Sequence, residues 1–229
     1  MNIFKRPQRQ DDNYKISYSQ CGEDLIVAFI FGAWKIPDWT YLDLGAHHPT
    51  EISNTYLFYR QGHRGVCVEP DPNLFAEIQR VRAEDVCLNV GVGTGAETAG
   101  DFYIMSSKSL NTFSKTAAES YQADGQQKIE KIVRLPLVSV NQLVAEYFNP
   151  YPNFVSLDIE GLDFEVLQTF DFDSFRPEVF CVETLTYTTN KTERKMIETT
   201  DLMISKGYFP YADTFINTIF VRRDSWAVR

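Results

Sequence analysis

The stretch Tyr41-Leu-Asp-Leu-Gly-Ala-His-His-Pro49 decides the fold of this chain. An apolar run leads into an acidic residue and a glycine turn, which predicts a buried strand that ends near Asp43 and Gly45. In an open α/β sheet, ligands bind beyond the carboxyl ends of the strands, where helix N-termini and loop amides converge. Glycine also lets the backbone approach a ligand closely. We therefore expect a ligand site at this turn; the alternative is a plain strand-turn-helix unit.

The composition is that of an acidic globular chain. It has 229 residues, 44% of them hydrophobic, and its 31 acidic and 22 basic side chains give a net charge of -9. A nucleic-acid-binding protein normally presents a basic face to the phosphates, so we expect neither DNA nor RNA as a partner. No apolar run reaches the ~20 residues of a membrane span.

The ends and the cysteines of the chain point to the cytoplasm. Residues 1–13 lack the apolar core of a secretory signal, and we expect a disordered tail there. Cys21, Cys67, Cys87 and Cys181 show no C-x-x-C spacing, and three of them fall in predicted strands. We interpret them as reduced thiols of a cytoplasmic protein.

Strands and helices alternate along the chain. Buried strands are predicted over 40–44, 65–68, 86–90, 154–158 and 179–182. Helices are predicted over 20–33 (with Ser19 as N-cap), 55–61, 72–81 (with Asp71 as N-cap), 140–148 (with a capping box from Ser139), 162–170 and 191–206. Two last strands, over 208–213 and 216–221, lie so close together that they must pair antiparallel. The pattern predicts one α/β domain over 14–229: a mostly parallel sheet, helices on both faces and one reversed strand at the end.

Two segments in the middle of the chain differ from this alternation. Residues 91–96 fit G-x-G-x-x-A, but a strand over 101–105 follows where the dinucleotide fingerprint requires a helix. We interpret them as a glycine-rich turn. Residues 106–131 are polar and without apolar periodicity. A connection of this length is typically a lid or a binding loop, or else disordered.

Four of the predicted strands end in carboxylates: Asp43, Glu69, Asp158 and Glu183. Parallel strands present their carboxyl ends at one edge of the sheet, so we expect these side chains to gather there; helix N-capping is the alternative. A carboxylate at the end of the second strand can accept hydrogen bonds from both ribose hydroxyls of a nicotinamide or an adenosyl ligand.

Other candidates lie in the turns. His47 and His48 can contact a cofactor or act as a base, or they can simply pack in their loop. His63 precedes the second strand, so we expect it at the opposite edge with a structural role. Asp158 and Glu160 are two residues apart and would face one side of the pleat if the strand continued through both.

Together these motifs resemble the FkbM-type methyltransferases. The residues that carry the resemblance are SQCGEDLIV (19–27), YLDLGAHHP (41–49), SNTYLFYRQGHRGVCVEPDP (53–72), NVGVG (89–93), SLDIEGLDFEVL (156–167) and INTIFVRR (216–223). The resemblance implies a class I, Rossmann-like fold that depends on S-adenosylmethionine, with a seven-stranded sheet whose last strand is antiparallel.

The resemblance also implies roles for single residues. Asp43, Gly45 and Ala46 would bind the methionyl part of the cofactor, Glu69 its ribose, and Asn89 and Val90 its adenine, while Asp158 would stand beside the methyl group. The predicted cofactor-binding residues are Asp43, Gly45, Ala46, His47, Asn54, Thr55, Glu69, Pro70, Asn89, Val90 and Asp158.

The chain departs from the family at one position of the first turn. The family often writes this turn as D-x-G-A-x-x-G, and Pro49 takes the place of the last glycine. Proline offers no backbone N–H. Donors near Asn54 or Thr55, or the side chain of His47 or His48, would then bind the carboxylate of the cofactor.

The resemblance implies methylation of a hydroxyl oxygen on a sugar, polysaccharide or natural product. Asp158, Glu160 and Glu183 are the candidate bases, followed by His47. A carboxylate of ordinary pKa is a weak base for an alcohol, so it needs burial, or a Mg²⁺ ion held by Asp158 and Glu183. The alternatives are a nicotinamide-dependent oxidoreductase and a catalytically silent cofactor-binding partner of another protein.

The acceptor side of the site is predicted less sharply. Tyr103, Phe113 and Tyr121, in or next to residues 106–131, can stack on a sugar ring, although ordinary packing is the alternative.

Overall fold

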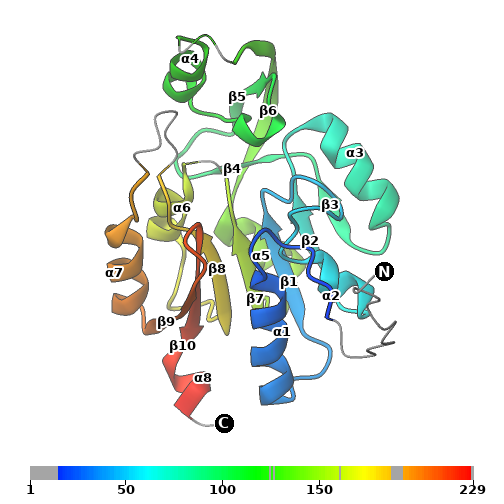
Figure 1. The fold of residues 1–229 in the computed structure, drawn as a ribbon, viewed down its shortest axis with the longest axis vertical. Helices are drawn as coiled ribbons and strands as arrows, with labels where there is room; N and C mark the ends of the chain where they lie inside the picture. The colour runs from blue at the N-terminus through cyan, green and yellow to red at the C-terminus, as the bar shows by residue number, and fades with distance from the viewer. Residues whose placement is uncertain (1–14, 124, 126, 160, 187–192, 228–229) are drawn as a thin grey trace, which may run out of the picture.

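A seven-stranded sheet forms the centre of the molecule. The computed structural model describes residues 15–123, 125, 127–159, 161–186 and 193–227, so the expected tail over 1–13 lies outside the described residues. The strand order is β3-β2-β1-β7-β8-β10-β9 (Figure 1). All neighbouring strands are parallel except β10, which runs antiparallel to both β8 and β9. The predicted mostly parallel sheet with one reversed strand is therefore confirmed.

The strands of the large sheet lie close to their predicted positions. They are β1 (Thr40–Leu44), β2 (Arg64–Val68), β3 (Val86–Leu88), β7 (Phe154–Leu157), β8 (Val179–Glu183), β9 (Tyr208–Asp213) and β10 (Asn217–Arg222). Successive side chains point to opposite faces, and both faces are covered, so the central strands are apolar at almost every position. In β8, for example, Phe180 packs into one core cluster and Cys181 into the other.

Helices cover both faces of this sheet. One face carries α1 (Glu23–Trp34), α2 (Tyr56–Arg60) and α3 (Pro72–Val81), and the other carries α5 (Val140–Tyr147), α6 (Asp163–Thr169) and α7 (Ile197–Ser205) (Figure 1). The short helix α8 (Arg223–Ala227) follows β10. No helix among the described residues is long and apolar enough to span a bilayer.

The first residues of some helices agree with the capping signals in the sequence, and those of others do not. Asp71 caps α3 by accepting the N–H of Asn73 at 2.8 Å, and Ser139 begins α5 with a capping box. The N-cap of α1 is Gly22 rather than Ser19. The predicted helix over 191–206 begins only at Ile197 among the described residues, because residues 194–196 pair with 184–186 instead.

A smaller unit, residues 91–139, stands over the carboxyl edge of the large sheet, and we call it the cap (Figure 1). Its sheet has the order β4-β6-β5, and a single-turn 3₁₀ helix and an α-helix complete it. The elements are β4 (Gly91–Gly93), β5 (Ala99–Met105), η1 (Lys108–Leu110), α4 (Lys115–Ala123) and β6 (Ile129–Ser139).

The glycine-rich run is therefore not only a turn, because Gly91–Gly93 pairs with β6. A Cβ on Gly91 would lie 2.2 Å from the ring of Phe113, so glycine permits this close packing. Tyr103 and Tyr121 belong to an apolar cluster inside the cap. These two aromatic residues therefore pack in the protein, which was the alternative to stacking on a sugar ring.

The tightest backbone contact at the carboxyl edge lies between the turns that follow β1 and β7. Gly45 has φ 82°, and a Cβ there would lie 1.8 Å from the carbonyl oxygen of Asp158. The N–H of Asp158 donates to the carbonyl oxygen of Leu44 at 3.1 Å, and the N–H groups of Gly45 and Ala46 donate to Val68. The turns after β1, β2 and β7 are thus fixed to one another through backbone atoms.

We expect Gly45→Ala to destabilise the protein more than a left-handed alanine alone does. The left-handed backbone costs roughly 1–2 kcal/mol in a non-glycine residue, and here the turns must also move apart. Gly62→Ala is the matched control, because Gly62 has φ 98° but an added Cβ would meet nothing within 4 Å. Denaturant unfolding of both variants measures the difference. Equal losses of unfolding free energy would show that the turn can accommodate a Cβ next to Asp158 at no further cost.

Candidate cofactor and acceptor site

A cavity of about 430 Å³ opens at the carboxyl edge of the sheet, beneath the cap. All four strand-end carboxylates, Asp43, Glu69, Asp158 and Glu183, line it. The prediction that they gather at one edge is therefore confirmed. The cavity runs from the end of β2 to the turn before β10, following the strand order of the sheet.

Most of the predicted site residues line this cavity. They are Asp43, Gly45, Ala46, His47, Asn54, Glu69, Pro70, Val90, Asp158 and Glu183. Two other predicted residues do not line the cavity but hydrogen-bond to residues that do. The hydroxyl of Thr55 donates to Asp43. The side-chain amide of Asn89 donates to the carbonyl oxygens of Glu69 (2.9 Å) and Pro70 (2.8 Å). The prediction for Glu160 lies outside the described residues. From the cap, residues 108–113 form part of the wall.

Glu69 is held in place by backbone donors. Its Oε2 accepts the N–H of His47 at 2.8 Å, and its Oε1 accepts the N–H of Asp71 at 2.7 Å. Burial raises the pKa of Glu69 to about 8, against the effect of these two hydrogen bonds. Each carboxylate oxygen can accept a second hydrogen bond, so ribose hydroxyls can still be bound.

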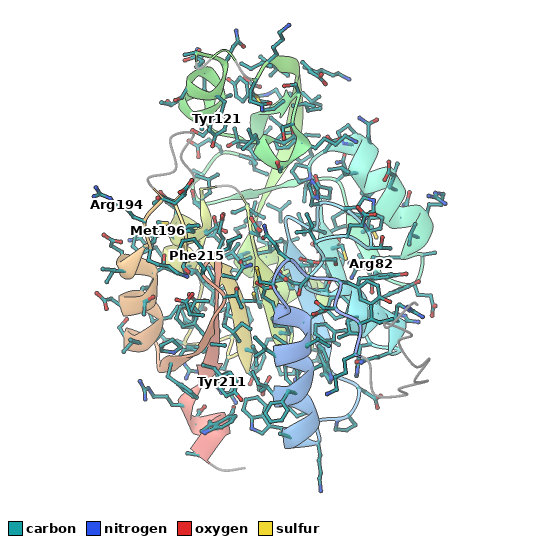
Figure 2. All side chains as sticks on the ribbon, in the orientation of Figure 1. Arg82, Tyr121, Arg194, Met196, Tyr211 and Phe215 are labelled. Carbon is teal, nitrogen blue, oxygen red and sulfur yellow. The ribbon has the colours of Figure 1, made fainter. Side chains whose placement is uncertain are left out.

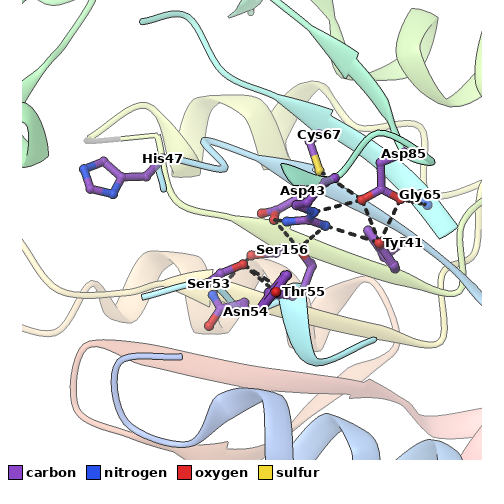
Figure 3. Close-up of polar contacts among 12 residues, drawn as sticks. Tyr41, Asp43, His47, Ser53, Asn54, Thr55, Gly65, Cys67, Asp85 and Ser156 are labelled. Atoms are coloured by element: carbon purple, nitrogen blue, oxygen red, sulfur yellow. Dashed lines mark hydrogen bonds and ion pairs between the residues drawn. The ribbon is translucent and has the colours of Figure 1, made fainter. Parts of the chain in front are cut away.

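Asp43 rests on a buried arginine that the sequence analysis did not identify. Arg82 follows α3 and is fully buried; its Nη1 lies 3.7 Å from Oδ2 of Asp43 and its Nε 2.9 Å from Oδ2 of Asp85. Its Nη2 donates to the hydroxyls of Thr55 (2.9 Å) and Tyr41 (3.2 Å). Figure 3 shows its partners Tyr41, Asp43, Thr55 and Asp85 side by side. Burial raises the pKa of Asp43, while Arg82 and Thr55 oppose that shift. Arg82 therefore positions Asp43.

Asp158 is half-buried and lies close to other acids. Burial raises its pKa to about 6, and the charges of Asp43 and Glu23 add to the shift. Asp163 supports the turn that follows Asp158 by accepting the N–H groups of Ile159 (3.1 Å) and Gly161 (3.2 Å). Burial and the charge of Asp158 raise the pKa of Asp163 to about 7. The turn is thus held by a second acid, which the sequence analysis also missed.

The histidines have three different environments. The side chain of His47 points away from Asp43 (Figure 3), and its buried Nε2 has no hydrogen-bond partner among the described residues. Burial lowers the pKa of His47, which keeps the ring neutral at pH 7. His48 instead accepts backbone N–H groups of its own loop, including that of Glu51 at 3.0 Å. His63 stacks on Trp39 with ring centroids 4.3 Å apart, in the expected structural role.

The sequence model of the methyltransferase FkbM domain matches residues 43–211. The chain belongs to this family. It is therefore a methyltransferase that uses S-adenosylmethionine, and the nicotinamide alternative is wrong. No curated protein matches the chain.

Several solved methyltransferases are similar in structure. Magnesium protoporphyrin IX methyltransferase from Synechocystis PCC 6803 is 12% identical, with a TM-score of 0.40 over 87% of this chain and 77% of that one. Precorrin-6y C5,15-methyltransferase from Geobacter metallireducens GS-15 is 9% identical, with a TM-score of 0.42 over 93% and 95%. At these low values, the similarities carry no conclusion about the site of this FkbM-family chain.

The acidic lining of the cavity fits a ligand with positive charge and hydroxyl groups, as S-adenosylmethionine has. Asp43, Glu69 and Asp158 line it, and carboxylates of this kind can pair with a cation or accept hydroxyl groups; their assignment to the methionyl, ribose and methyl parts of the cofactor stays a prediction. The unpartnered Nε2 of His47 is a further polar atom for the ligand. Among the residues described, no group of three or more His, Cys, Asp or Glu side chains is arranged to hold a metal ion. Mg²⁺ bound by Asp158 and Glu183 stays a prediction.

Replacing Arg82 should cost far more stability than replacing an exposed arginine. Arg82→Met leaves Asp43 and Asp85 buried without a compensating charge, and we expect a loss of about 3–5 kcal/mol in unfolding free energy. Arg134→Met is the control; it breaks an exposed pair with Asp101 (2.8 Å) and should cost at most about 1 kcal/mol. Denaturant unfolding tests this, and losses of equal size would contradict the role of Arg82.

Binding of S-adenosylhomocysteine should strengthen as pH rises toward 8. Below its pKa, Glu69 must lose a proton before the carboxylate can accept two ribose hydroxyls, so affinity should rise by up to about tenfold per pH unit and level off above pH 8. Calorimetric titrations from pH 6 to pH 9 measure this slope. Glu69→Gln should bind more weakly and with a flatter pH profile; an unchanged slope in this variant would assign the titration to another group.

Proposed function

We propose that this FkbM-family chain methylates a hydroxyl oxygen of a sugar, polysaccharide or natural product. The observation that carries the proposal is Asp158, a half-buried carboxyl group in the wall of the cavity with a pKa raised to about 6. A base is most effective when its pKa lies near the working pH, and this shift moves a carboxylate in that direction. Such a base suits an alcohol, which is a poor nucleophile while it holds its proton.

In this proposal the chain aligns the reactants and removes one proton. When bound, S-adenosylmethionine supplies an electrophilic methyl group. The cavity wall holds the acceptor oxygen in line with it, and alignment of this kind can contribute roughly 7–11 kcal/mol. Asp158 would accept the hydroxyl proton as the acceptor oxygen forms its bond to the methyl carbon. The carbon–sulfur bond would break with its electron pair on sulfur, so that S-adenosylhomocysteine is the leaving group, and the proton would pass from Asp158 to solvent.

Other residues can assist or replace Asp158. Glu183 ends β8, the strand next to β7, and lines the same cavity. His47 is kept neutral by burial, so it can also accept a proton. We keep Glu183 as the second candidate base and His47 as the third, and Glu160 remains a predicted candidate outside the described residues.

Asp158→Asn should lower kcat by about 10²–10⁴-fold, because the amide cannot accept the proton. The affinity for S-adenosylhomocysteine, measured by calorimetry, should change much less. Glu183→Gln is the comparison variant: a larger loss of kcat there than in Asp158→Asn would make Glu183 the base. Turnover is followed as release of S-adenosylhomocysteine and a mass gain of one methyl group, with a panel of glycans, sugar nucleotides and natural-product alcohols.

The same assay separates the alternatives. If EDTA abolishes turnover and Mg²⁺ restores it, the proton is lost from a metal-bound hydroxyl and Asp158 and Glu183 act as ligands. If EDTA has no effect, the metal version is wrong. Tight binding of S-adenosylmethionine without turnover of any acceptor would favour the silent cofactor-binding partner over the enzyme.

A further inference from the structure

Three exposed side chains from three separate loops lie at the mouth of the cavity: Gln20, Ile52 and Phe215, which we call the rim. Ile52 is 59% exposed and Phe215 is 64% exposed, although both are apolar. Figure 2 shows Phe215 near the head of the β9–β10 hairpin, on the side of the cap. The rim therefore presents exposed apolar side chains where the cavity opens to solvent.

Buried hydrogen bonds join the three rim loops into one unit. The carboxylate of Glu23 is fully buried and accepts the Thr214 hydroxyl at 2.6 Å, the Asn217 amide at 3.1 Å and the N–H of Cys21 at 2.8 Å. These bonds tie the loop of Gln20 to the turn of Phe215. The N–H of Ser53 donates to the carbonyl oxygen of Tyr18 at 2.8 Å, which adds the loop of Ile52.

The backbone of the rim is held in an unfavourable conformation. Ile52 has φ 54° and Phe215 has φ 76°, and a β-branched residue in this region is a real outlier. Neither side chain gains burial in exchange for this strain. Strained residues of this kind cluster at binding sites, where the surrounding structure enforces them. The strain here directs two apolar side chains to the cavity mouth.

The charges on this side of the cavity are negative. Asp158, Glu183 and Glu193 line it, and the one lysine among the described lining residues, Lys108, lies near His47 at the β2 side. Lys195 is close to the rim turn, but its Nζ is bonded to Asp213 (2.8 Å) and to Thr184 (2.9 Å). Among the described lining residues the acids therefore outnumber the cations, with Lys108 as the one lysine, so an anionic acceptor is disfavoured there.

We propose that the rim is the acceptor-binding subsite and that it selects an uncharged acceptor with an apolar face beside its hydroxyl. This inference rests on the proposed O-methyl transfer. Phe215 and Ile52 pack against the apolar face, and the amide of Gln20 can both donate to and accept from neighbouring hydroxyls. The acids disfavour a phosphate or carboxylate next to the reacting oxygen.

The experiment compares matched neutral and anionic acceptors. 4-Nitrophenyl β-glucopyranoside and 4-nitrophenyl β-glucuronide differ only at C6, which carries a hydroxymethyl group in the first and a carboxylate in the second. The methyl ester of the glucuronide, which is neutral and also lacks the 6-hydroxyl, is the control for the lost hydroxyl, and galacto and manno sets extend the series. We expect kcat/KM to be about 100-fold higher for the neutral member, since like charges in contact oppose binding strongly. Phe215→Ala should raise KM for the neutral acceptor about tenfold and leave S-adenosylhomocysteine binding unchanged. Phe29→Ala, an equally exposed phenylalanine outside the cavity lining, should change neither.

Two results would overturn the rim. One is equal turnover of the glucuronide and the glucopyranoside, and the other is a KM that responds alike to Phe215→Ala and Phe29→Ala. If S-adenosylhomocysteine binds but nothing is methylated, the proposed O-methyl transfer is wrong. The rim is then tested separately, by saturation-transfer NMR of glycoside binding to the protein with S-adenosylhomocysteine bound. The rim is supported if the neutral glycosides bind and Phe215→Ala abolishes this binding. It is overturned if neither the neutral nor the anionic glycoside binds, or if both bind equally.

Discussion

The burial of negative charge at one edge of the sheet is the constraint on which this site depends. Acids that share a poorly solvated region raise the pKa of one another, and each loses hydration. Arg82 offsets Asp43 and Asp85 directly, whereas Glu69 and Asp163 are supported by backbone N–H groups. The arrangement is suited to a cationic cofactor, because the positive charge of the cofactor would neutralise the acids that the protein itself neutralises only in part.

Close backbone packing makes this concentration of charge possible. Gly45 brings the turn after β1 against Asp158, and a side chain at that position would separate the two. At the mouth of the cavity, Ile52 and Phe215 take left-handed conformations that cost stability. The chain thus gives up stability at the turns and at the rim, and it recovers stability in the two apolar cores on either side of the sheet.

The cavity is built from parts that differ in how firmly they are anchored. Its floor is the carboxyl edge of a sheet buried on both faces, which fixes the carboxylates on rigid strand ends. Its walls come from the cap and from the rim loops, which have their own small clusters and hydrogen bonds. In our proposal the floor binds the cofactor and the rim binds the acceptor.

The sequence by itself determined the strands, the caps at Asp71 and Ser139, and the strand-end acids, because each follows from a local pattern. Apolar runs give buried strands, and parallel strands bring their carboxyl ends together. Only the tertiary structure decided that Arg82 supports Asp43, or that Gln20 meets Phe215 at one mouth. These partners lie far apart along the chain, and which loops meet depends on how the whole sheet twists and packs. No periodicity or spacing in the sequence contains that information.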